Sequence, residues 1–276
     1  MFERATMASV VGRDMNSDCK LFRGDCLDVL KSIESLSVNL TVTSPPYDSL
    51  RAYEGLPFDK FKLVAEELFR VTKPGGIVVW VVGDATEKGS ETGSSFKQAL
   101  YFKKCGFNIH DTMIYLKNSY VPLTHRRYEQ AFEYMFIFSK GVPSTFNPIM
   151  IPCKTAGSFR NRGAAKQYES SYSERKREER TLVRSHKQAP NYFVYDVGKN
   201  EKTAHNAPFP DQLASDHIKS WSNVGDTVLD PFMGSGTTGK EALKLNRRFI
   251  GIELDAGYFD IAKRRIGSCN LQAEFK

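Results

Sequence analysis

The chain has 276 residues, of which 41% are hydrophobic and 12% aromatic, and its formal net charge is +7. This length accommodates one large α/β domain with an insertion. No apolar run approaches the roughly 18 residues that a membrane-spanning helix needs, which excludes a transmembrane helix. Five cysteines without a Cys-x-x-Cys pair indicate reduced thiols, as in a cytoplasmic protein, and no metal site.

Residues 1–18 lack an apolar core and are predicted to be a flexible N-terminal extension. After them, short apolar runs typical of strands alternate with segments of helical apolar spacing. The predicted strands lie at residues 21–23, 38–43, 77–82, 107–117, 133–139, 227–230 and 248–253. The predicted helices lie at residues 27–33, 58–71, 94–105, 211–221, 239–245 and 258–266. This alternation predicts an α/β fold with a doubly wound, mostly parallel seven-stranded sheet, which binds ligands at the carboxyl ends of its strands.

Residues 43–47, Thr-Ser-Pro-Pro-Tyr, follow the predicted strand at 38–43. Two adjacent prolines end the strand and leave a rigid loop without a backbone N–H at either proline. The loop carbonyls remain acceptors beside a tyrosine ring, so the loop can hold a flat molecule by its amine and stack on its face. The alternative for Tyr47 is a turn residue that caps the sheet, since prolines mark turns generally.

The periodicity fades between residues 141 and 200, and this segment is predicted to be an insertion in the fold. Between Lys154 and Lys187 there are ten lysines and arginines but four acidic residues. Such a basic segment suits a polyanionic partner. A solvated helix over residues 173–184 is the alternative.

A glycine-rich turn connects the strand at 227–230 to the helix at 239–245. The strand ends in Asp230, and the turn is Pro-Phe-Met-Gly-Ser-Gly-Thr-Thr. Glycines at such a turn let a ligand approach the backbone closely. The next strand ends in Glu253, 23 positions after Asp230 and near the roughly 20-residue offset at which an acid meets a ribose hydroxyl. The turn predicts a nucleoside site, with an exposed strand end as the alternative for Glu253.

The same turn has a rival interpretation as a phosphate-binding P-loop. Residues 234–240, Gly-Ser-Gly-Thr-Thr-Gly-Lys, fit the G-x-x-x-x-G-K pattern. The next residue should be Ser or Thr to hold Mg²⁺, but it is Glu241, and the preceding strand ends in Asp230 instead of neutral backbone. These departures favour the nucleoside site.

Together, these motifs and their order resemble those of the β-class DNA amino-methyltransferases. In that family a Ser/Asp/Asn-Pro-Pro-Tyr motif comes first, a basic insertion second and an Asp-Pro-Phe-x-Gly-Ser-Gly-Thr-Thr motif last. Residues 205–210, His-Asn-Ala-Pro-Phe-Pro, resemble the family's His-Pro-Ala-x-Phe-Pro segment, with Asn206 in place of proline. The resemblance covers about residues 20–266 and implies a Rossmann-like methyltransferase fold. Its parts would be a catalytic half at 19–140, a target-recognition region at 141–200 and a cofactor-binding half at 201–270.

The resemblance implies S-adenosyl-L-methionine as the cofactor. The residues that would bind it are Asp25, Cys26, Thr43, Ser44, His205, Phe209, Asp230, Phe232, Gly234, Ser235, Gly236, Thr237 and Glu253. Glu253 would take the ribose hydroxyls, and Asp25 would take the adenine amine. The alternative for Asp25 is an N-cap of the helix at 27–33.

The resemblance also implies a reaction on a base that is flipped out of the duplex. The catalytic residues would be Ser44, Pro45, Pro46 and Tyr47. Tyr47 would stack on the base, while Ser44 and the Pro45 carbonyl would accept hydrogen bonds from its amine and localise the amine lone pair for attack on the methyl group. Within the family, Ser before Pro-Pro-Tyr is associated with cytosine N4, and Asp or Asn with adenine N6. Ser44 therefore favours cytosine, and adenine is the alternative.

Double-stranded DNA is the implied partner, and it places the protein with the nucleoid in the cytoplasm. The residues of the insertion that would contact DNA are Arg160, Arg162, Lys166, Arg175, Lys176, Arg177 and Arg180. Because the family belongs to restriction-modification systems, a cognate restriction endonuclease is a further candidate partner, as is a second copy of the chain in a homodimer.

Four other functions fit the residues less well. Methylation of cytosine C5 needs a thiolate, and the Pro-Cys pair that ends at Cys153 is followed by Lys154 where that family has glutamine. Amino-methyltransferases of RNA or protein usually have the two motifs in the reverse order. A P-loop NTPase needs Ser or Thr at position 241. A non-catalytic DNA-binding module has no use for an intact Ser-Pro-Pro-Tyr loop.

Overall fold

The structure is a computed structural model. It describes residues 11–16, 18–46, 56–119, 126–161, 180–196 and 210–273. The chain divides into two compact units. The first unit, Met1–Asn147 with Asn191–Lys276, holds the large sheet and its helices, and the second, Pro148–Pro190, holds two small β-ribbons.

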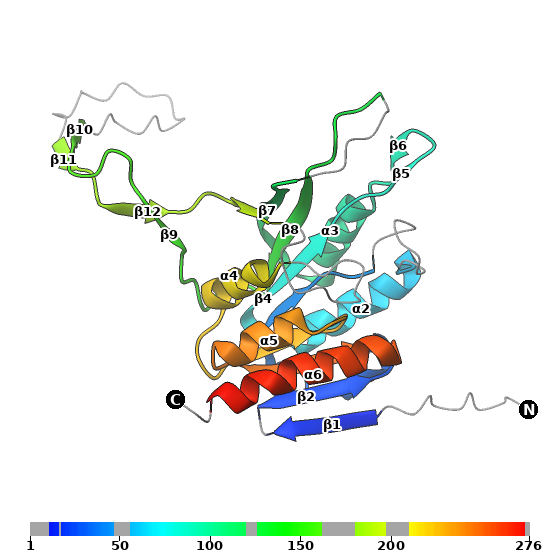
Figure 1. The fold of residues 1–276 in the computed structure, drawn as a ribbon. Coiled ribbons are helices and arrows are strands. Elements are labelled where there is room, and N and C mark those ends of the chain that lie inside the picture. The colour runs from blue at the N-terminus through cyan, green and yellow to red at the C-terminus, as the bar shows by residue number, and fades with distance from the viewer. Residues whose placement is uncertain are drawn as a thin grey trace, which may run out of the picture. The chain divides into compact units, whose positions relative to one another are not determined.

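In the first unit one sheet has the strand order β1-β2-β15-β14-β3-β4-β8-β7-β13 (Figure 1). Its strands are β1 (Val11–Asn16), β2 (Cys19–Arg23), β3 (Val38–Thr43), β4 (Thr72–Val82), β7 (Asn108–Lys117), β8 (Phe132–Ser139), β13 (Tyr192–Tyr195), β14 (Thr227–Asp230) and β15 (Arg248–Glu253). Strands β2, β15, β14, β3 and β4 are parallel neighbours, whereas β8 runs antiparallel to both β4 and β7. The predicted doubly wound, mostly parallel sheet is confirmed, and all seven predicted strands are present in it.

Two edge strands make this sheet nine-stranded, wider than the predicted seven. Strand β1 falls within residues 1–18, which were expected to be flexible, and pairs antiparallel with β2. Strand β13 falls within residues 141–200, which were expected to be inserted, and pairs parallel with β7. An edge strand bonds to one neighbour only, so that neighbour can recruit a segment whose own apolar pattern is weak.

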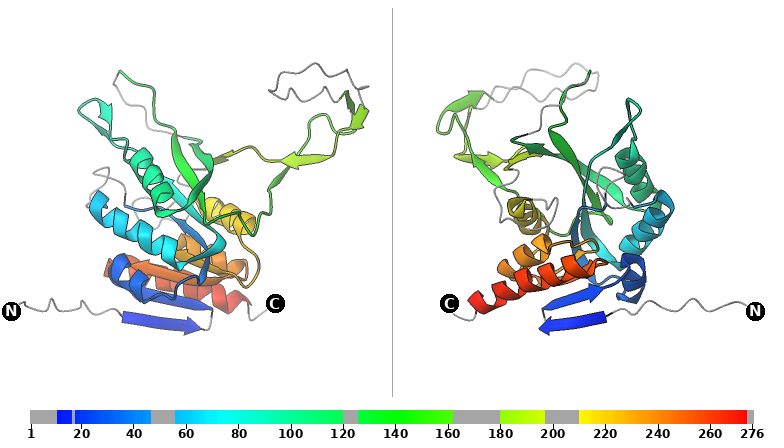
Figure 2. Two further views of the ribbon diagram at one scale, coloured as in Figure 1. Left: turned by 180° about the vertical axis from the view of Figure 1, so that it is seen from behind. Right: turned by 45° about the vertical axis from the view of Figure 1, so that its right-hand side comes forward.

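Helices cover both faces of the sheet (Figure 2). Helices α1 (Cys26–Ser32), α2 (Phe58–Val71) and α3 (Ser94–Cys105) lie on one face, and α4 (Asp211–Trp221), α5 (Thr237–Lys244) and α6 (Ala256–Ala273) lie on the other. Helix α2 buries Phe61, Val64 and Leu68, which share one stripe because they are three to four residues apart. Pro74 prevents it from continuing. Among the described residues, no helix combines the length and apolar character that crossing a membrane requires.

Separate hydrophobic clusters are buried on the two faces of the sheet. Strand β4 contributes to both, with Trp80 toward α2 and α3 and Val79 toward α4. The Trp80 ring lies 5.1 Å from that of Phe102 and 5.8 Å from that of Phe61, measured between centroids. Burial on both faces explains why residues 77–82 form an uninterrupted apolar run. A short hairpin of β5 (Thr86–Glu87) and β6 (Ser90–Glu91) follows this strand.

The second unit consists of antiparallel pairs. Strand β9 (Met150–Pro152) pairs with β12 (His186–Gln188), and β10 (Phe159–Asn161) pairs with β11 (Arg180–Leu182). Because β11 is extended, the alternative of a solvated helix over 173–184 is wrong for the part of that segment that the structure describes. The unit is narrower than the predicted insertion at 141–200, since β13 belongs to the sheet. Its role in target recognition stays a prediction.

Candidate active site

The predicted site residues gather at the carboxyl ends of adjacent parallel strands. Asp25 follows β2, Glu253 ends β15, Asp230 ends β14 and Ser44 follows β3. The strands are neighbours in the order β2-β15-β14-β3. Residues that lie far apart in the sequence therefore come to one edge of the sheet, where doubly wound folds bind their ligands.

The glycine turn after β14 requires glycine for two reasons. Gly234 and Gly236 have φ values of 50° and 83°, in the left-handed region where side chains are disfavoured. A Cβ added to Gly236 would also lie 3.0 Å from both Ala262 Cβ and Ile266 Cδ1 of α6. The turn is thus packed tightly against α6 on one side, and α5 starts directly after Gly236.

Glu253 is bound to the glycine turn by hydrogen bonds. Its Oε2 accepts from the Gly234 N–H at 2.9 Å, and its Oε1 accepts from the Asp255 N–H at 2.8 Å. Burial raises the pKa of Glu253, and these N–H donors partly offset that effect. An ionised carboxylate can accept about four hydrogen bonds, so both oxygens keep capacity for a pair of hydroxyl donors. Glu253 is half-buried and held in place, in contrast to a plain exposed strand end.

Asp25 caps helix α1, as the alternative for this residue predicted. Its Oδ1 accepts from the Leu27 N–H at 2.9 Å, and its Oδ2 accepts from Lys60 Nζ of α2 at 2.5 Å. Burial alone would raise the pKa of Asp25, but the Lys60 and Leu27 hydrogen bonds outweigh it and lower the pKa. Asp25 therefore stays ionised, and its contact with adenine stays a prediction.

Asp230 is buried inside the protein. It is 1% exposed, and its Oδ1 accepts from Thr43 Oγ1 at 2.7 Å and from the Phe232 N–H at 3.1 Å. Burial raises the pKa of Asp230 to about 6, although these hydrogen bonds act in the opposite direction. The Thr43 contact joins the strand that leads into the Pro-Pro-Tyr loop to the strand that leads into the glycine turn. Direct contact of Asp230 or Thr43 with a cofactor stays a prediction.

Two other predicted cofactor residues pack against the hydrophobic interior. Cys26 is buried, and burial raises the pKa of its thiol to about 12, so the thiol is neutral. The Phe232 ring meets the Trp80 ring edge-on at 6.2 Å between centroids. Phe232 thus anchors the start of the glycine turn to the core.

The Pro-Pro-Tyr loop is described as far as Pro46. Pro45 is buried, while Ser44 and Pro46 are half-buried. The Pro46 carbonyl accepts a hydrogen bond from the Leu56 N–H at 3.3 Å, which brings residues 46 and 56 together just before α2. The predicted site residues Tyr47, His205 and Phe209 lie outside the described residues.

Comparison with known proteins identifies the family. A family model described as DNA methylase matches residues 38–264. The orphan methyltransferase M.BamHII of Bacillus amyloliquefaciens is 49% identical to this chain, over 86% of the chain and 91% of its own length. The chain belongs to the DNA amino-methyltransferases. The type II methyltransferase M.MjaI of Methanocaldococcus jannaschii is a more distant relative, 28% identical over 92% of this chain and 93% of its own.

Solved structures of methyltransferases share the fold of this DNA amino-methyltransferase. The cytosine-N4-specific PvuII DNA methyltransferase matches with a TM-score of 0.68 and 22% identity, over 90% of this chain and 86% of its own. TTHA0409 of Thermus thermophilus, solved in complex with S-adenosyl-L-methionine, matches with a TM-score of 0.60 and 26% identity, over 90% of this chain and 95% of its own.

The geometry of the methyltransferase contradicts a P-loop at residues 234–240. A P-loop lysine must extend toward bound phosphates. Lys240 instead turns to Asp211, with Nζ 2.5 Å from Oδ2, and also lies 3.9 Å from a carboxylate oxygen of Glu241. Its side chain is 11% exposed, so both contacts lie largely inside the protein.

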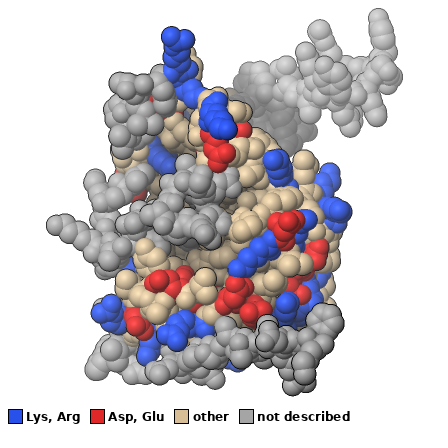
Figure 3. All heavy atoms as spheres, turned by 90° about the vertical axis from the view of Figure 1, so that its right-hand side faces the viewer, with Lys and Arg blue, Asp and Glu red and all other residues tan. Residues whose placement is uncertain are grey.

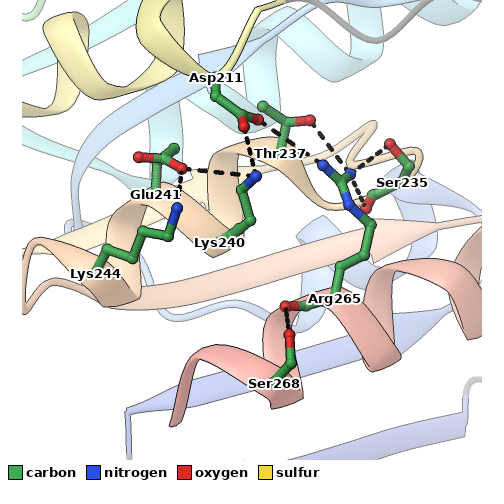
Figure 4. Close-up of polar contacts among 8 residues, drawn as sticks. All are labelled: Asp211, Ser235, Thr237, Lys240, Glu241, Lys244, Arg265 and Ser268. Carbon is green, nitrogen blue, oxygen red and sulfur yellow. Dashed lines mark hydrogen bonds and ion pairs between the residues drawn. The ribbon is translucent and has the colours of Figure 1, made fainter. Parts of the chain in front are cut away.

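A polar cluster behind the glycine turn was not predicted from the sequence. Figure 4 shows Asp211, Ser235, Lys240 and Arg265 turned toward one another. They come from the start of α4, the glycine turn, α5 and α6. Lys60, the partner of Asp25, was also missed. In each case helix packing brings the partner into contact, so the spacing of residues in the sequence does not predict the pair.

The predicted DNA-binding residues Arg162, Lys166, Arg175, Lys176 and Arg177 lie outside the described part of the chain. Arg160 and Arg180 are in the paired strands β10 and β11, opposite Thr181 and Asn161 respectively. On the face of the methyltransferase in Figure 3, lysines and arginines are interspersed with acidic residues. The described residues of that face therefore present mixed charge.

The family also argues against two of the alternative functions, cytosine C5 methylation and non-catalytic DNA binding. Membership of the amino-methyltransferases argues against cytosine C5 chemistry at Cys153, which lies in the second unit with its N–H donated to the Ser185 carbonyl at 2.8 Å. A non-catalytic DNA-binding module also disagrees with the family. Within the described residues, no group of three or more His, Cys, Asp or Glu side chains could hold a metal ion.

Proposed function

We propose that the chain transfers the methyl group of S-adenosyl-L-methionine to the N4 amine of cytosine in double-stranded DNA. The observation that carries the proposal is the hydrogen bond between Thr43 and Asp230, at 2.7 Å. It fixes the Ser-Pro-Pro segment beside the glycine turn, so a base amine and a methyl donor would meet between them.

The residues of the glycine turn fit the nucleoside part of this cofactor. Glu253 is a held acceptor with spare lone pairs for two ribose hydroxyls, and glycine at positions 234 and 236 allows the left-handed φ values that shape the turn. TTHA0409, which is 26% identical, was solved with S-adenosyl-L-methionine. When bound, this cofactor supplies an electrophilic methyl group on a sulfonium.

The protein's contribution to the reaction is positioning. The Pro45 carbonyl and Ser44 hydroxyl would accept hydrogen bonds from the two N–H groups of the cytosine amine, which holds the amine lone pair out of conjugation and aimed at the methyl group. Tyr47 stacks on the flipped base. No covalent bond to the enzyme is needed. The buried pair of Thr43 and Asp230 would hold the start of the Ser-Pro-Pro segment in place.

Cytosine is favoured over adenine by Ser44, since Ser at this position accompanies N4-cytosine activity in the family. The PvuII methyltransferase, a fold neighbour, is cytosine-N4-specific. Residues 148–190 and the basic residues around them would read the DNA target. The relative M.BamHII is an orphan methyltransferase, so this enzyme also acts without a partner endonuclease in our proposal. Its work on double-stranded DNA would place it with the nucleoid in the cytoplasm.

The proposal is tested by analysing the nucleosides of methylated DNA. Purified protein is incubated with unmethylated genomic DNA and methyl-labelled cofactor, and the digested nucleosides are separated by mass spectrometry. We expect labelled N4-methyldeoxycytidine, and no label with the Tyr47→Ala variant. Label in N6-methyldeoxyadenosine alone would contradict the cytosine assignment while leaving the amino-methyltransferase intact.

A further inference from the structure

The Arg265 side chain of α6 reaches the back of the glycine turn. Its Nη1 donates to the Ser235 carbonyl at 2.7 Å and to Ser235 Oγ at 2.8 Å, with a longer contact of 3.5 Å to Thr237 Oγ1 (Figure 4). Ser235 is 1% exposed. Its hydroxyl and carbonyl therefore face Arg265 and the protein interior. Ser235 would thus affect a ligand only by setting the path of the backbone in the turn.

The glycine turn needs such an external support. Glycines at 234 and 236 give the backbone conformational freedom that no side chain restricts. Ser235 lies between these two glycines, and its carbonyl is part of the peptide group that connects it to Gly236. A hydrogen bond to this carbonyl therefore fixes the orientation of that peptide group. A charged donor makes a stronger hydrogen bond than a neutral one. Arg265 thus holds a peptide of the turn that is next to a glycine.

Asp211 and Lys240 hold Arg265 in turn. Asp211 Oδ1 lies 3.8 Å from Arg265 Nη2, and Asp211 Oδ2 lies 2.5 Å from Lys240 Nζ. The side chains of Arg265, Lys240 and Asp211 are 13%, 11% and 30% exposed, so solvent screens these charges only partly. One carboxylate therefore orients two cations from different helices.

The position of Asp211 in the chain connects this cluster to a second motif of the sequence. It is the first residue of α4 and directly follows residues 205–210, the segment that resembles a cofactor motif of the family. Through Asp211 and Arg265, the end of that segment and the glycine turn share one charged cluster. The cluster therefore links the start of α4 to the glycine turn.

We propose that Arg265, oriented by Asp211 and Lys240, is a positioning residue for S-adenosyl-L-methionine. It acts through the Ser235 peptide and does not touch the cofactor. The inference rests on the proposed function in one respect, namely that this turn binds the cofactor. It is independent of which base is methylated.

The test compares Arg265→Met with Arg264→Met. Arg264 is the exposed neighbour of Arg265 on the same helix, so its replacement removes the same charge without reaching the turn. Cofactor affinity is measured by calorimetry without DNA. We expect Arg265→Met to raise the Kd at least tenfold, about 1.4 kcal/mol, and Arg264→Met to stay within about twofold of wild type.

Three further readouts separate positioning from general loss of structure. At saturating cofactor, kcat and the KM for DNA should change less than about twofold in Arg265→Met, because the turn is then held by its ligand. Arg265→Lys should recover part of the affinity, since its ammonium keeps a charged donor near Ser235. Amide hydrogen exchange at the start of α5 should be faster in cofactor-free Arg265→Met than in wild type.

Unchanged cofactor affinity in folded Arg265→Met would overturn the inference, as would an equal loss in Arg264→Met. If Arg265→Met does not fold, Asp211→Asn and Arg265→Lys decide the matter. Both should weaken cofactor binding at least twofold, and wild-type affinity in both would contradict the inference. A wild-type protein that binds no S-adenosyl-L-methionine would contradict the proposed function itself, whereas wild-type binding with an unaffected Arg265→Met contradicts only this inference.

Discussion

Replacing Thr43 by valine should destabilise the protein strongly for so small a change. Valine keeps the shape and the strand preference of threonine but removes the hydroxyl that donates to Asp230 Oδ1 at 2.7 Å. Thr43 is 0% and Asp230 1% exposed, so water cannot replace the lost donor. A hydrogen bond to a charged group contributes about 1.5–3 kcal/mol, and we expect a loss of about 2 kcal/mol at about pH 8.

The loss should depend on pH because of the ionisation of Asp230. Its pKa of about 6 in the folded protein exceeds the ordinary 3.8, so the ionised form opposes folding by about 3 kcal/mol at high pH. This penalty starts to decrease as the pH falls below about 6, where the folded carboxyl takes up a proton, and it is gone below 3.8, where the carboxyl is also protonated in the unfolded chain. At about pH 5 Thr43 mostly faces a neutral carboxyl, and the effect of Thr43→Val should shrink to about 1 kcal/mol.

The chain offers a matched control on the same strand. Thr41 is also 0% exposed, and among the described residues its Oγ1 has no hydrogen-bond partner. Thr41→Val should therefore be neutral or slightly stabilising. Urea unfolding is followed by the fluorescence of the two tryptophans, Trp80 and Trp221, which are both buried. If Thr43→Val loses no more stability than Thr41→Val at about pH 8, the coupling role of Asp230 is refuted.

The other predictions concern the cofactor, DNA and acid stability. Glu253→Ala should weaken S-adenosyl-L-methionine binding at least tenfold, about 1.4 kcal/mol, in calorimetry of the folded variant; unchanged affinity contradicts the ribose assignment. Replacing Arg175, Arg177 and Arg180 by glutamine should lower DNA affinity and flatten its salt dependence while cofactor binding stays intact, since phosphate contacts release counterions; a wild-type salt slope would mean that these charges only face solvent. Burial lowers the pKa of His217 to about 4 from its usual 6.5, so its contribution to stability is present above pH 6.5 and is lost as the pH falls toward 4. The stability of His217→Leu, measured by urea unfolding, should therefore fall less than that of the wild type over this pH range. Parallel pH profiles of the two proteins would contradict the role of His217.

The elements that could be predicted from the sequence are those whose own pattern fixes their environment. Helix α2 has a regular apolar stripe, and residues 77–82 are apolar without interruption because both faces of β4 are buried. Strands β1 and β13 could not be predicted in this way. Their place is set by backbone hydrogen bonds to β2 and β7, which are provided by other parts of the fold.

The candidate site shows the same division. The strand ends before Ser44 and at Glu253 could be located, because two prolines closely follow the first apolar run and an acidic residue ends the second. The charged partners could not. Lys60 meets Asp25 through the packing of α2 on α1, and Arg265 meets Ser235 only because α6 lies beside the turn. Tertiary packing decides both contacts, so the sequence pattern left Asp25 with two open roles.

The strand order has a consequence for how the protein is made. Strands β2 and β3 both come from the first 43 residues, yet β15 and β14 lie between them in the sheet. During synthesis, the backbone edge of β3 that pairs with β14 stays without its partner until residues 227–230 have emerged. Such long-range pairing forms slowly and exposes strand edges that can aggregate. A ribosome-bound chain that ends before Thr227 should therefore depend on chaperones. The growing chain should gain methyltransferase activity only after β14 and β15 have entered the sheet.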